Sequence, residues 1–233
     1  MTEIIPGVYK VDGVRGANAY MIVDDGITVI DTGMGDNSAA FLNAARGLGY
    51  GPSDIKRIVI THAHMDHTGS VAALRAATGA KVMIGEADAD ALEGKVPQPV
   101  PKMPFPLSLI ISVARKYFIK LKPSPVDVRL KDDDTIPVMG GMTVIGLPGH
   151  SPGNLGLYIP SKKLVFSGDT LRAKGDDFIK PLNYDAEKAQ SLASIKKLGS
   201  LDFEIMLSGH NVPVMSGASK KLKAYAEKLS KEG

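Results

Sequence analysis

The residues of this chain whose types and spacing point most directly to chemistry are its histidines. There are five, and each lies at or just beyond the end of an apolar run: His62, His64, His67, His150 and His210. Imidazole nitrogens suit Zn²⁺, Fe²⁺ or Mn²⁺, and carboxylates can complete such a site. The chain has no cysteine, which excludes thiolate metal sites, thiol nucleophiles and disulfides. The histidines therefore predict a metal site built from nitrogen and oxygen ligands.

The segment HAHMDH holds three of the histidines, and its spacing suits two neighbouring sites. It follows the apolar run RIVIT (57–61), which predicts a short strand that opens into a loop. His62 and His64 are two residues apart, so in an extended chain their side chains point the same way and can bind one metal. Asp66 and His67 come where the chain turns into the next helix, and we expect them to face an adjacent site.

Three later segments repeat one pattern, an apolar strand followed by a small residue and a polar side chain. They are TVIGLPGH, LVFSGD and EIMLSGH, which end at His150, Asp169 and His210. Strand ends that deliver ligands to one edge of a sheet commonly build a site. Taken alone, Asp169 could instead cap a helix, and Asp31 after the strand ITVI could be an ordinary turn residue. Ser151 lies in no G-x-S-x-G elbow and has no spare histidine as its base, which disfavours a serine hydrolase.

Apolar and β-branched runs bounded by turn residues predict the strands that must position these side chains. The predicted strands cover residues 8–11, 18–24, 27–31, 57–61, 81–85, 126–130, 142–147, 155–159, 163–168 and 204–209. Helical periodicity predicts helices over residues 38–48, 70–78 and 186–198 and from about residue 218. We expect the first three strands to form an antiparallel meander. Two runs of strands, each closed by helices, predict two sheets packed face to face with helices outside.

The composition is that of an ordinary globular protein. Hydrophobic residues make up 44% and charged residues 23% of the 233 residues, which excludes a disordered chain. The net charge of +3, from 28 basic and 25 acidic residues, predicts no nucleic-acid partner. No apolar run is long enough to predict a membrane span. No secretory signal is visible at the start, so we expect a cytoplasmic protein.

Residues 94–125 depart from this pattern of strands and helices. They hold seven of the fifteen prolines: Pro97, Pro99, Pro101, Pro104, Pro106, Pro123 and Pro125. Between the prolines, apolar residues recur at helical spacing: Leu107, Ile110, Ile111, Ala114, Tyr117, Phe118 and Leu121. We interpret residues 1–233 as a single domain with a proline-rich helical insertion at about 94–125. The insertion could cover its own core, form a lid over a substrate pocket, or contact a membrane or a second copy in a homodimer.

The motifs HAHMDH, GHSPGN, SGDT and SGH, in this order and after an early DTG at 31–33, resemble those of the metallo-β-lactamase superfamily of binuclear hydrolases. The resemblance covers about residues 6–215. It implies an α+β fold, a four-layer αβ/βα sandwich of two mixed β-sheets with helices outside. It also implies two divalent metal ions, with Zn²⁺ favoured and Fe or Mn as alternatives.

The resemblance assigns a role to each candidate residue. The first metal would be held by His62, His64 and His150, the second by Asp66, His67 and His210, and both by Asp169. Asp31 would support the site without being a ligand. Asp66 and His210 would also be catalytic, with Asp66 carrying a proton.

The same resemblance implies a small-molecule hydrolase in which a hydroxide shared by the metals attacks an ester, lactone or thioester of a small, apolar substrate. The ligand set is similar to those of glyoxalase II and of lactonases. Glyoxalase II differs in having a second histidine where this chain has Asn154, and a longer C-terminal part that binds glutathione. The presence of Asp169 and the lack of cysteine argue against β-lactam hydrolysis. The alternatives are a phosphotriester or phosphodiester hydrolase on the same site, and a mononuclear iron oxidoreductase resembling persulfide dioxygenases.

Overall fold

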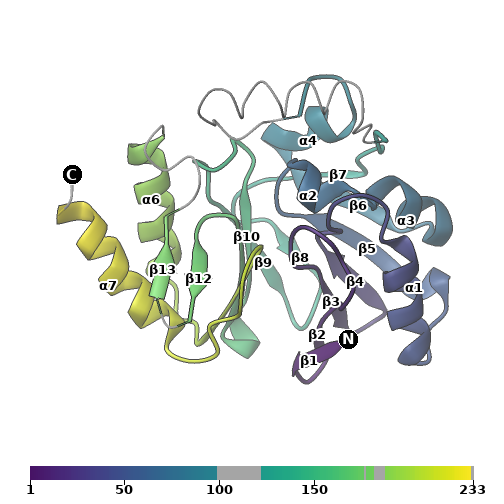
Figure 1. Cartoon of the computed structure of the whole chain (residues 1–233), viewed down its shortest axis with the longest axis horizontal. Coiled ribbons are helices and arrows are strands. Elements are labelled where there is room, and N and C mark those ends of the chain that lie inside the picture. Colours follow the sequence, from purple (N-terminus) through teal and green to yellow (C-terminus); the bar gives the residue numbers. More distant parts are fainter. Residues whose placement is uncertain (99–121, 176, 181–186, 232–233) are drawn as a thin grey trace.

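Two β-sheets pack face to face, with helices on both outer sides (Figure 1). The computed structural model describes residues 1–98, 122–175, 177–180 and 187–231. The first sheet has seven strands, which pair in chain order: β1 (Thr2–Ile5), β2 (Val8–Lys10), β3 (Tyr20–Val23), β4 (Ile27–Ile30), β5 (Ile55–Ile60), β6 (Lys81–Gly85) and β7 (Val128–Leu130). Strands β1 to β4 are antiparallel, whereas β4 to β7 are parallel, so the sheet is mixed.

The second sheet has five strands in the order β14-β11-β10-β9-β8. Their bounds are β8 (Thr135–Ile136), β9 (Met142–Gly146), β10 (Leu155–Ile159), β11 (Leu164–Gly168) and β14 (Ile205–Ser208). Strands β8 to β11 pair antiparallel, and β11 pairs parallel with β14, so this sheet is mixed as well. A separate antiparallel pair is formed by β12 (Arg172–Lys174) and β13 (Asp177–Ile179).

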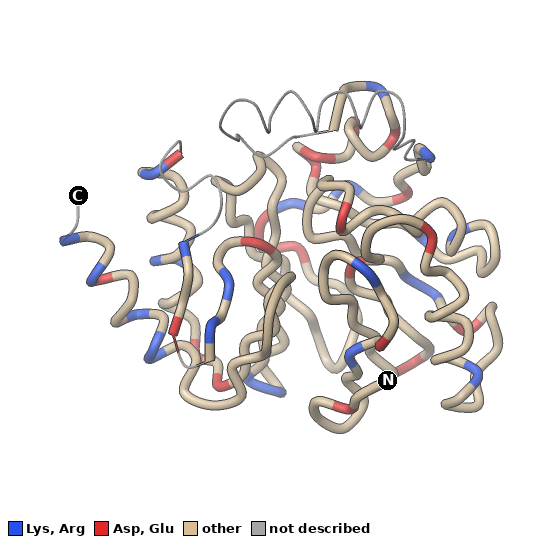
Figure 2. Tube along the Cα trace, viewed as in Figure 1, with Lys and Arg blue, Asp and Glu red and all other residues tan. Residues whose placement is uncertain are grey.

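Helices cover the outer face of each sheet. Those beside the first sheet are α1 (Ser38–Gly47), α2 (Met65–Thr68), α3 (Val71–Thr78) and α4 (Glu86–Leu92), and those beside the second are α6 (Lys188–Gly199) and α7 (Ala218–Lys231). Short 3₁₀ turns η1 (Pro52–Asp54) and η2 (Pro160–Lys162) precede β5 and β11. Lysines line the exposed side of α7 (Figure 2). Within the described residues, no helix is both long and apolar enough to cross a membrane.

Three apolar clusters separate these elements into four layers. One lies between the first sheet and helices α1, α3 and α4, one between the two sheets, and one between the second sheet and helices α6 and α7. Strand β3 illustrates the division, because successive side chains of a strand point to opposite faces. Tyr20 and Ile22 face the second sheet, where Tyr20 packs edge-on against Phe166 at 5.3 Å between ring centroids, while Met21 faces the helices. The predicted αβ/βα sandwich of two mixed sheets is confirmed.

Outside the predicted insertion, the predicted strands and helices are all present, within a few residues of the expected ends. The antiparallel meander is confirmed, and α3 ends where predicted, at a left-handed Gly79. Sequence patterns did not predict β1, β8, α4 or the β12–β13 pair. These elements are short, so they contain too few residues to establish a period.

The two ends of the predicted insertion meet beside the C-terminus of α4. A Cβ on Gly94 would lie 2.8 Å from Pro123 Cγ, and the Ser124 N–H donates to the Leu92 carbonyl at 3.1 Å. Residues 99–121 lie outside the described residues, and with them the apolar positions from Leu107 to Leu121. The lid hypothesis and the single-domain interpretation therefore stay predictions.

Candidate metal centre

Strand direction brings the predicted ligands to one edge, where the two sheets meet. The strands end shortly before them: Asp31 follows β4, His62 follows β5, His150 follows β9, Asp169 follows β11 and His210 follows β14. Strands β4 and β5 are parallel, and β9, β11 and β14 share one direction because β9 and β11 are each antiparallel to β10. The Leu155 N–H donates to the Thr61 carbonyl at 2.9 Å and joins the sheets at this edge.

His62, His64 and His150 form a first donor group. His64 Nδ1 lies 2.9 Å from His62 Nε2 and 2.9 Å from His150 Nε2, and all three side chains are buried. The donor atoms of the three residues lie within 4.8 Å of one another. The structure therefore joins two residues of HAHMDH to a histidine that is 86 positions away from His64 in the sequence.

Asp66, His67 and His210 form a second donor group beside the first. Asp66 and His67 lie in α2, and His210 Nε2 is 3.2 Å from Asp66 Oδ2, while His67 Nε2 is 3.9 Å from the same oxygen. The side chains of Asp66 and His210 are 30% and 23% exposed, whereas His67 is fully buried. The second group is thus the one that faces solvent.

Asp169 lies between the two groups. Its Oδ2 is 3.5 Å from His150 Nε2 and 3.3 Å from His210 Nε2, and its Oδ1 is 3.6 Å from His67 Nε2. One carboxylate therefore contacts a histidine of each group. The structure brings together all seven side chains that the sequence analysis named as ligands.

Asp31 lies behind His67 and outside both groups. Its Oδ2 is 2.8 Å from His67 Nδ1, while its carboxylate also accepts hydrogen bonds from the Thr61 N–H and hydroxyl, each at 2.8 Å. This partner keeps a proton on Nδ1 and leaves Nε2 directed at the second group. Asp31 has a φ of 57°, a left-handed conformation that is costly for a non-glycine residue and is often found at functional sites.

The first group is electrically neutral near pH 7. Burial, reinforced by the neighbouring histidines, lowers the pKa of His62 well below its usual value and lowers the pKa of His64 to about 3. Burial also lowers the pKa of His150, although Asp169 partly offsets it. These rings consequently present lone pairs, the form that binds a cation.

In the second group, by contrast, the histidines are protonated near pH 7 when no cation is bound. Burial disfavours a charge on His67 and His210, but carboxylates raise the pKa of His67 to about 9 and that of His210 to about 10. Burial likewise opposes the charge on Asp66, yet the hydrogen bond from His210 and the charge of His67 lower its pKa to about 2. The pKa of Asp169 is lowered by the same two histidines against its burial. In the absence of a metal ion, the protonated rings of His67 and His210 therefore supply the positive charge that balances the two carboxylates.

The donor set fits divalent metal ions. His64 Nδ1 faces two other ring nitrogens, and no single proton on it can serve both, whereas one cation can accept all three lone pairs. His67 Nε2 and Asp169 Oδ1 are buried and have no hydrogen-bond partner among the described residues. Such groups cost free energy unless another partner satisfies them.

Sequence analysis missed several residues that hold the site. Thr61 fixes Asp31, and Asn154 bonds to the Asp169 N–H at 3.3 Å while donating to the Leu147 carbonyl at 2.9 Å. Gly209 packs directly on Asp169. Asn154 lies in the motif GHSPGN and Gly209 in the motif SGH. Their position beside predicted ligands was the signal that could have identified them as part of the site.

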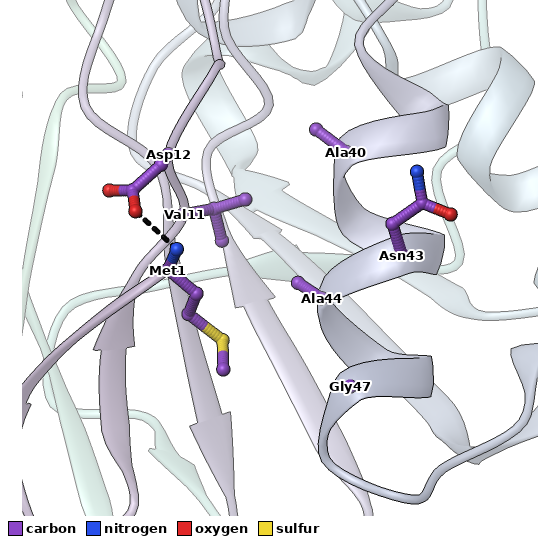
Figure 3. Close-up of a pocket in the computed structure, with 7 residues that line it drawn as sticks. All are labelled: Met1, Val11, Asp12, Ala40, Asn43, Ala44 and Gly47. Carbon is purple, nitrogen blue, oxygen red and sulfur yellow. Dashed lines mark hydrogen bonds and ion pairs between the residues drawn. The ribbon is translucent and has the colours of Figure 1, made fainter.

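A pocket near the start of the chain contains none of the donor residues (Figure 3). It lies between Met1, Asp12 and the small side chains of α1, including Ala40 and Ala44. The Met1 amino group pairs there with Asp12. The one carboxylate that lines this hollow is thus already paired, and the candidate site stays at the junction of the sheets.

Known proteins resemble this chain over most of its length. The family model of the metallo-beta-lactamase superfamily matches residues 12–210. A probable metallo-hydrolase of Bacillus subtilis, YflN, is 25% identical over 91% of this chain and 86% of its own length. A hydroxyacylglutathione hydrolase of Cereibacter sphaeroides is 30% identical over 67% of this chain and 48% of its own length, so the chain spans about half of that relative.

Solved structures share the arrangement of the sheets. A metallo-beta-lactamase family protein from Thermus thermophilus superposes with a TM-score of 0.73 at 21% identity, covering 97% of this chain and 81% of its own. A subclass B3 metallo-beta-lactamase of Bradyrhizobium japonicum gives a TM-score of 0.71 at 24% identity, covering 99% of this chain and 90% of its own. The likeness to these structures shows the fold, and the family match extends across every predicted motif. The chain belongs to the metallo-beta-lactamase superfamily, as its motifs predicted.

Proposed function

We propose that this protein is a binuclear metal-dependent hydrolase that cleaves an ester, lactone or thioester of a small, apolar substrate. The observation that supports the proposal most directly is Asp169, whose carboxylate contacts a histidine of each donor group. Two metals that share a carboxylate are typical of hydrolases that act on carbonyl and phosphoryl centres. The relatives named metallo-hydrolase and hydroxyacylglutathione hydrolase support the same class of reaction.

In this proposal the groups seen in the structure are the ligand sets. One ion, most simply Zn²⁺, would be held by His62, His64 and His150, and the other by Asp66, His67 and His210, with Asp169 available to both and Asp31 orienting His67. Ligands of nitrogen and oxygen also suit iron and manganese. When bound, the two ions would polarise the substrate carbonyl and lower the pKa of a water molecule toward neutrality.

Asp66 and His210 are the members of the site that meet the substrate. Their side chains are 30% and 23% exposed, while the other donors are buried. The Asp66 carboxylate is ionised, because its pKa is lowered to about 2, and its partly exposed Oδ2 has free acceptor capacity toward the solvent side of the site. This assigns proton transfer to Asp66 Oδ2.

Two exposed apolar residues, one next to Asp66 in space and one close to His210 in the sequence, support an apolar substrate. Met34 is 42% exposed and Val212 is 55% exposed. A Cβ on Gly16 would touch both Met34 Cβ, at 2.8 Å, and Asp66 Cβ, at 3.1 Å, so Met34 lies next to Asp66. Val212 follows His210 by two residues. Exposed apolar residues at the rim of a polar site favour a substrate with an apolar part.

The hydroxyacylglutathione hydrolases among the relatives support a thioester substrate. This chain differs from glyoxalase II at Asn154, where that enzyme has a second histidine. Asn154 is buried, and it bonds to the loops of Leu147 and Asp169. A residue committed to these loops offers no contact to a substrate at the position where glyoxalase II has its second histidine.

The test is a metal count on the purified protein combined with a substrate panel. We expect about two divalent ions per chain, and turnover of apolar lactones, esters or thioesters above that of phosphotriesters, phosphodiesters, β-lactams and persulfides. Dialysis against a chelator should remove both the ions and the activity, and adding Zn²⁺ back should restore them. Full turnover by the metal-free protein would contradict the proposal.

The same panel separates the alternatives. Turnover confined to phosphate esters would assign the site to phosphoryl chemistry. One iron per chain together with oxygen consumption on a persulfide would assign it to oxidation. An acyl adduct on Ser151 by mass spectrometry would oppose direct hydrolysis, and we expect none, because Ser151 is buried and its hydroxyl donates to Asp88 at 2.9 Å.

Metal uptake at pH 7 is expected to release about two protons per chain, from His67 and His210. Both have a raised pKa, about 9 and about 10, so in the metal-free protein they are protonated below those values. His62 and His64 have lowered pKa values and release none. The release from the two rings should therefore vanish as the pH rises past about 10, which leaves only the proton of a metal-bound water. Titration calorimetry in buffers of different ionisation enthalpy measures it.

The variant His210→Ala provides the matched comparison for this prediction. It removes one of the two protonated rings, so the release at pH 7 should fall by about one proton. Uptake with no proton release at pH 7 in the unaltered protein would contradict the assignment of the second group.

A further inference from the structure

A buried carboxylate outside both donor groups contacts the loops that carry the first group. Asp88 lies in α4 and is 1% exposed. Its Oδ2 accepts hydrogen bonds from the Ala63 N–H at 2.8 Å and from the Ser151 hydroxyl at 2.9 Å, and its Oδ1 accepts one from the Gly153 N–H at 2.9 Å. Three donors from two distant loops thus converge on one side chain.

The donors stand directly beside the histidines of the first group. Ala63 separates His62 from His64, and Ser151 follows His150. Asp88 is 25 positions from Ala63 and 63 positions from Ser151 in the sequence. Its hydrogen bonds therefore connect two loops that are far apart along the chain. Among the side chains that the structure describes, the Asp88 carboxylate is the one that hydrogen-bonds to both of these loops.

We propose that Asp88 is a positioning residue that sets the spacing of His62, His64 and His150 and so determines the affinity of the first group for its metal ion. The inference rests on the proposed function for the presence of that ion, though the hydrogen bonds do not. Partners of this kind, one step behind the ligands, commonly change metal affinity by about 10- to 100-fold when they are removed.

A carboxylate is needed at position 88 because all three hydrogen-bond partners of Asp88 are donors. Two backbone N–H groups and a hydroxyl need an acceptor-only side chain, and an amide in its place would turn an NH₂ toward one of them. The space is also closed, since a Cβ on Gly153 would lie 2.6 Å from Asp88 Cγ. The side chain therefore cannot turn aside to avoid the conflict.

The hydrogen bonds of Asp88 reach neighbours of the first group, and none reaches His67 or His210. Asp31 bonds to His67 of the second group and to Thr61, whose hydroxyl also lies 3.1 Å from His62 Nδ1. Loss of Asp88 should consequently act on the first group and leave the second in place. This selectivity distinguishes positioning from a general loss of stability.

The first experiment uses the metal-free protein and needs no catalysis. Amide-resolved hydrogen exchange compares the unaltered protein with Asp88→Asn, and with Asp90→Asn as the matched control. Asp90 lies in the same helix, but its side chain is 48% exposed and pairs with Arg129 at 2.6 Å. Exchange at Ala63 and Gly153 should accelerate about tenfold or more in Asp88→Asn, because local opening governs it. The Gly209 N–H, bonded to the Gly168 carbonyl at 2.9 Å, should not change.

The second experiment measures Zn²⁺ affinity by competition with a chelator. In Asp88→Asn the binding of one of the two ions should weaken about 10- to 100-fold, while Asp90→Asn should bind both as the unaltered protein does. Ser151→Ala keeps the carboxylate and removes one of its three bonds, so it should weaken the same ion by a smaller factor. It serves as the test if Asp88→Asn does not fold.

The outcomes separate this inference from the proposed function. Unchanged exchange at Ala63 and Gly153, or unchanged affinity of both ions in a folded Asp88→Asn and in Ser151→Ala, overturns the role of Asp88. Equal weakening of both ions overturns it too. An unaltered protein that binds no divalent ion overturns the proposed function and the effect on affinity together, while the exchange data still decide whether Asp88 holds the two loops.

Discussion

Asp169→Ala is expected to abolish hydrolysis while leaving the fold largely intact. The carboxylate contacts histidines of both donor groups, at 3.3 to 3.6 Å, so its loss separates the two proposed metal positions. Metal ions contribute several kcal/mol to the transition state of such reactions, and about 4 kcal/mol corresponds to roughly a 10³-fold loss in kcat/KM. His62→Ala should behave similarly through the first group. Steady-state kinetics together with a metal count measure both effects.

The matched control is Asp202→Ala, which removes an exposed carboxylate paired with Lys163 at 2.9 Å. Surface ion pairs contribute little to stability, so kinetics, metal content and the circular dichroism spectrum should all stay unchanged. If Asp169→Ala kept two ions per chain and normal turnover, the shared carboxylate would have no function and the proposed binuclear site would be wrong.

Gly209→Ala is expected to impair the site although it removes no donor. A Cβ at this position would collide with Asp169 Oδ1 and lie 2.7 Å from His67 Cε1. The backbone of Gly209 has no positive φ, so alanine itself adopts it without strain and the effect comes from space alone. Displacement of reacting groups by about 1 Å can cost roughly 10²-fold in rate. We expect a loss of that size in kcat/KM, with weaker metal binding.

Gly47→Ala is the comparison for this prediction. Gly47 lies in α1, and a Cβ there would meet nothing within 4 Å. Alanine in a helix is more stable than glycine by about 0.5–1 kcal/mol, so the melting temperature should hold or rise with kinetics unchanged. Normal kinetics and metal content in Gly209→Ala would mean that Asp169 and His67 can shift without consequence for the reaction.

Residue types and spacing were enough to predict a metal site built on the five histidines, and the resemblance to a known family completed the set of donors. Each predicted ligand follows an apolar strand, and hydrophobic runs bounded by glycine mark strand ends because burial and turn geometry act locally. The same reasoning predicted the strands of both sheets. Strands β4 and β5 proved to be parallel, so their carboxyl ends meet at one edge and bring Asp31 near His62.

Spacing alone did not show which donors share a group, which only the family resemblance implied, and the side chains that hold them there emerged from the tertiary structure alone. His64 meets His150 across 86 positions, and Asp88 meets Ser151 across 63, distances over which no local period carries information. Asp88 sits in the short helix α4, which sequence patterns did not predict, so nothing marked it as buried. Gly209 became important only when the second sheet placed it against Asp169. Local propensity fixes elements and their ends, whereas close packing between distant segments fixes the partners of each side chain.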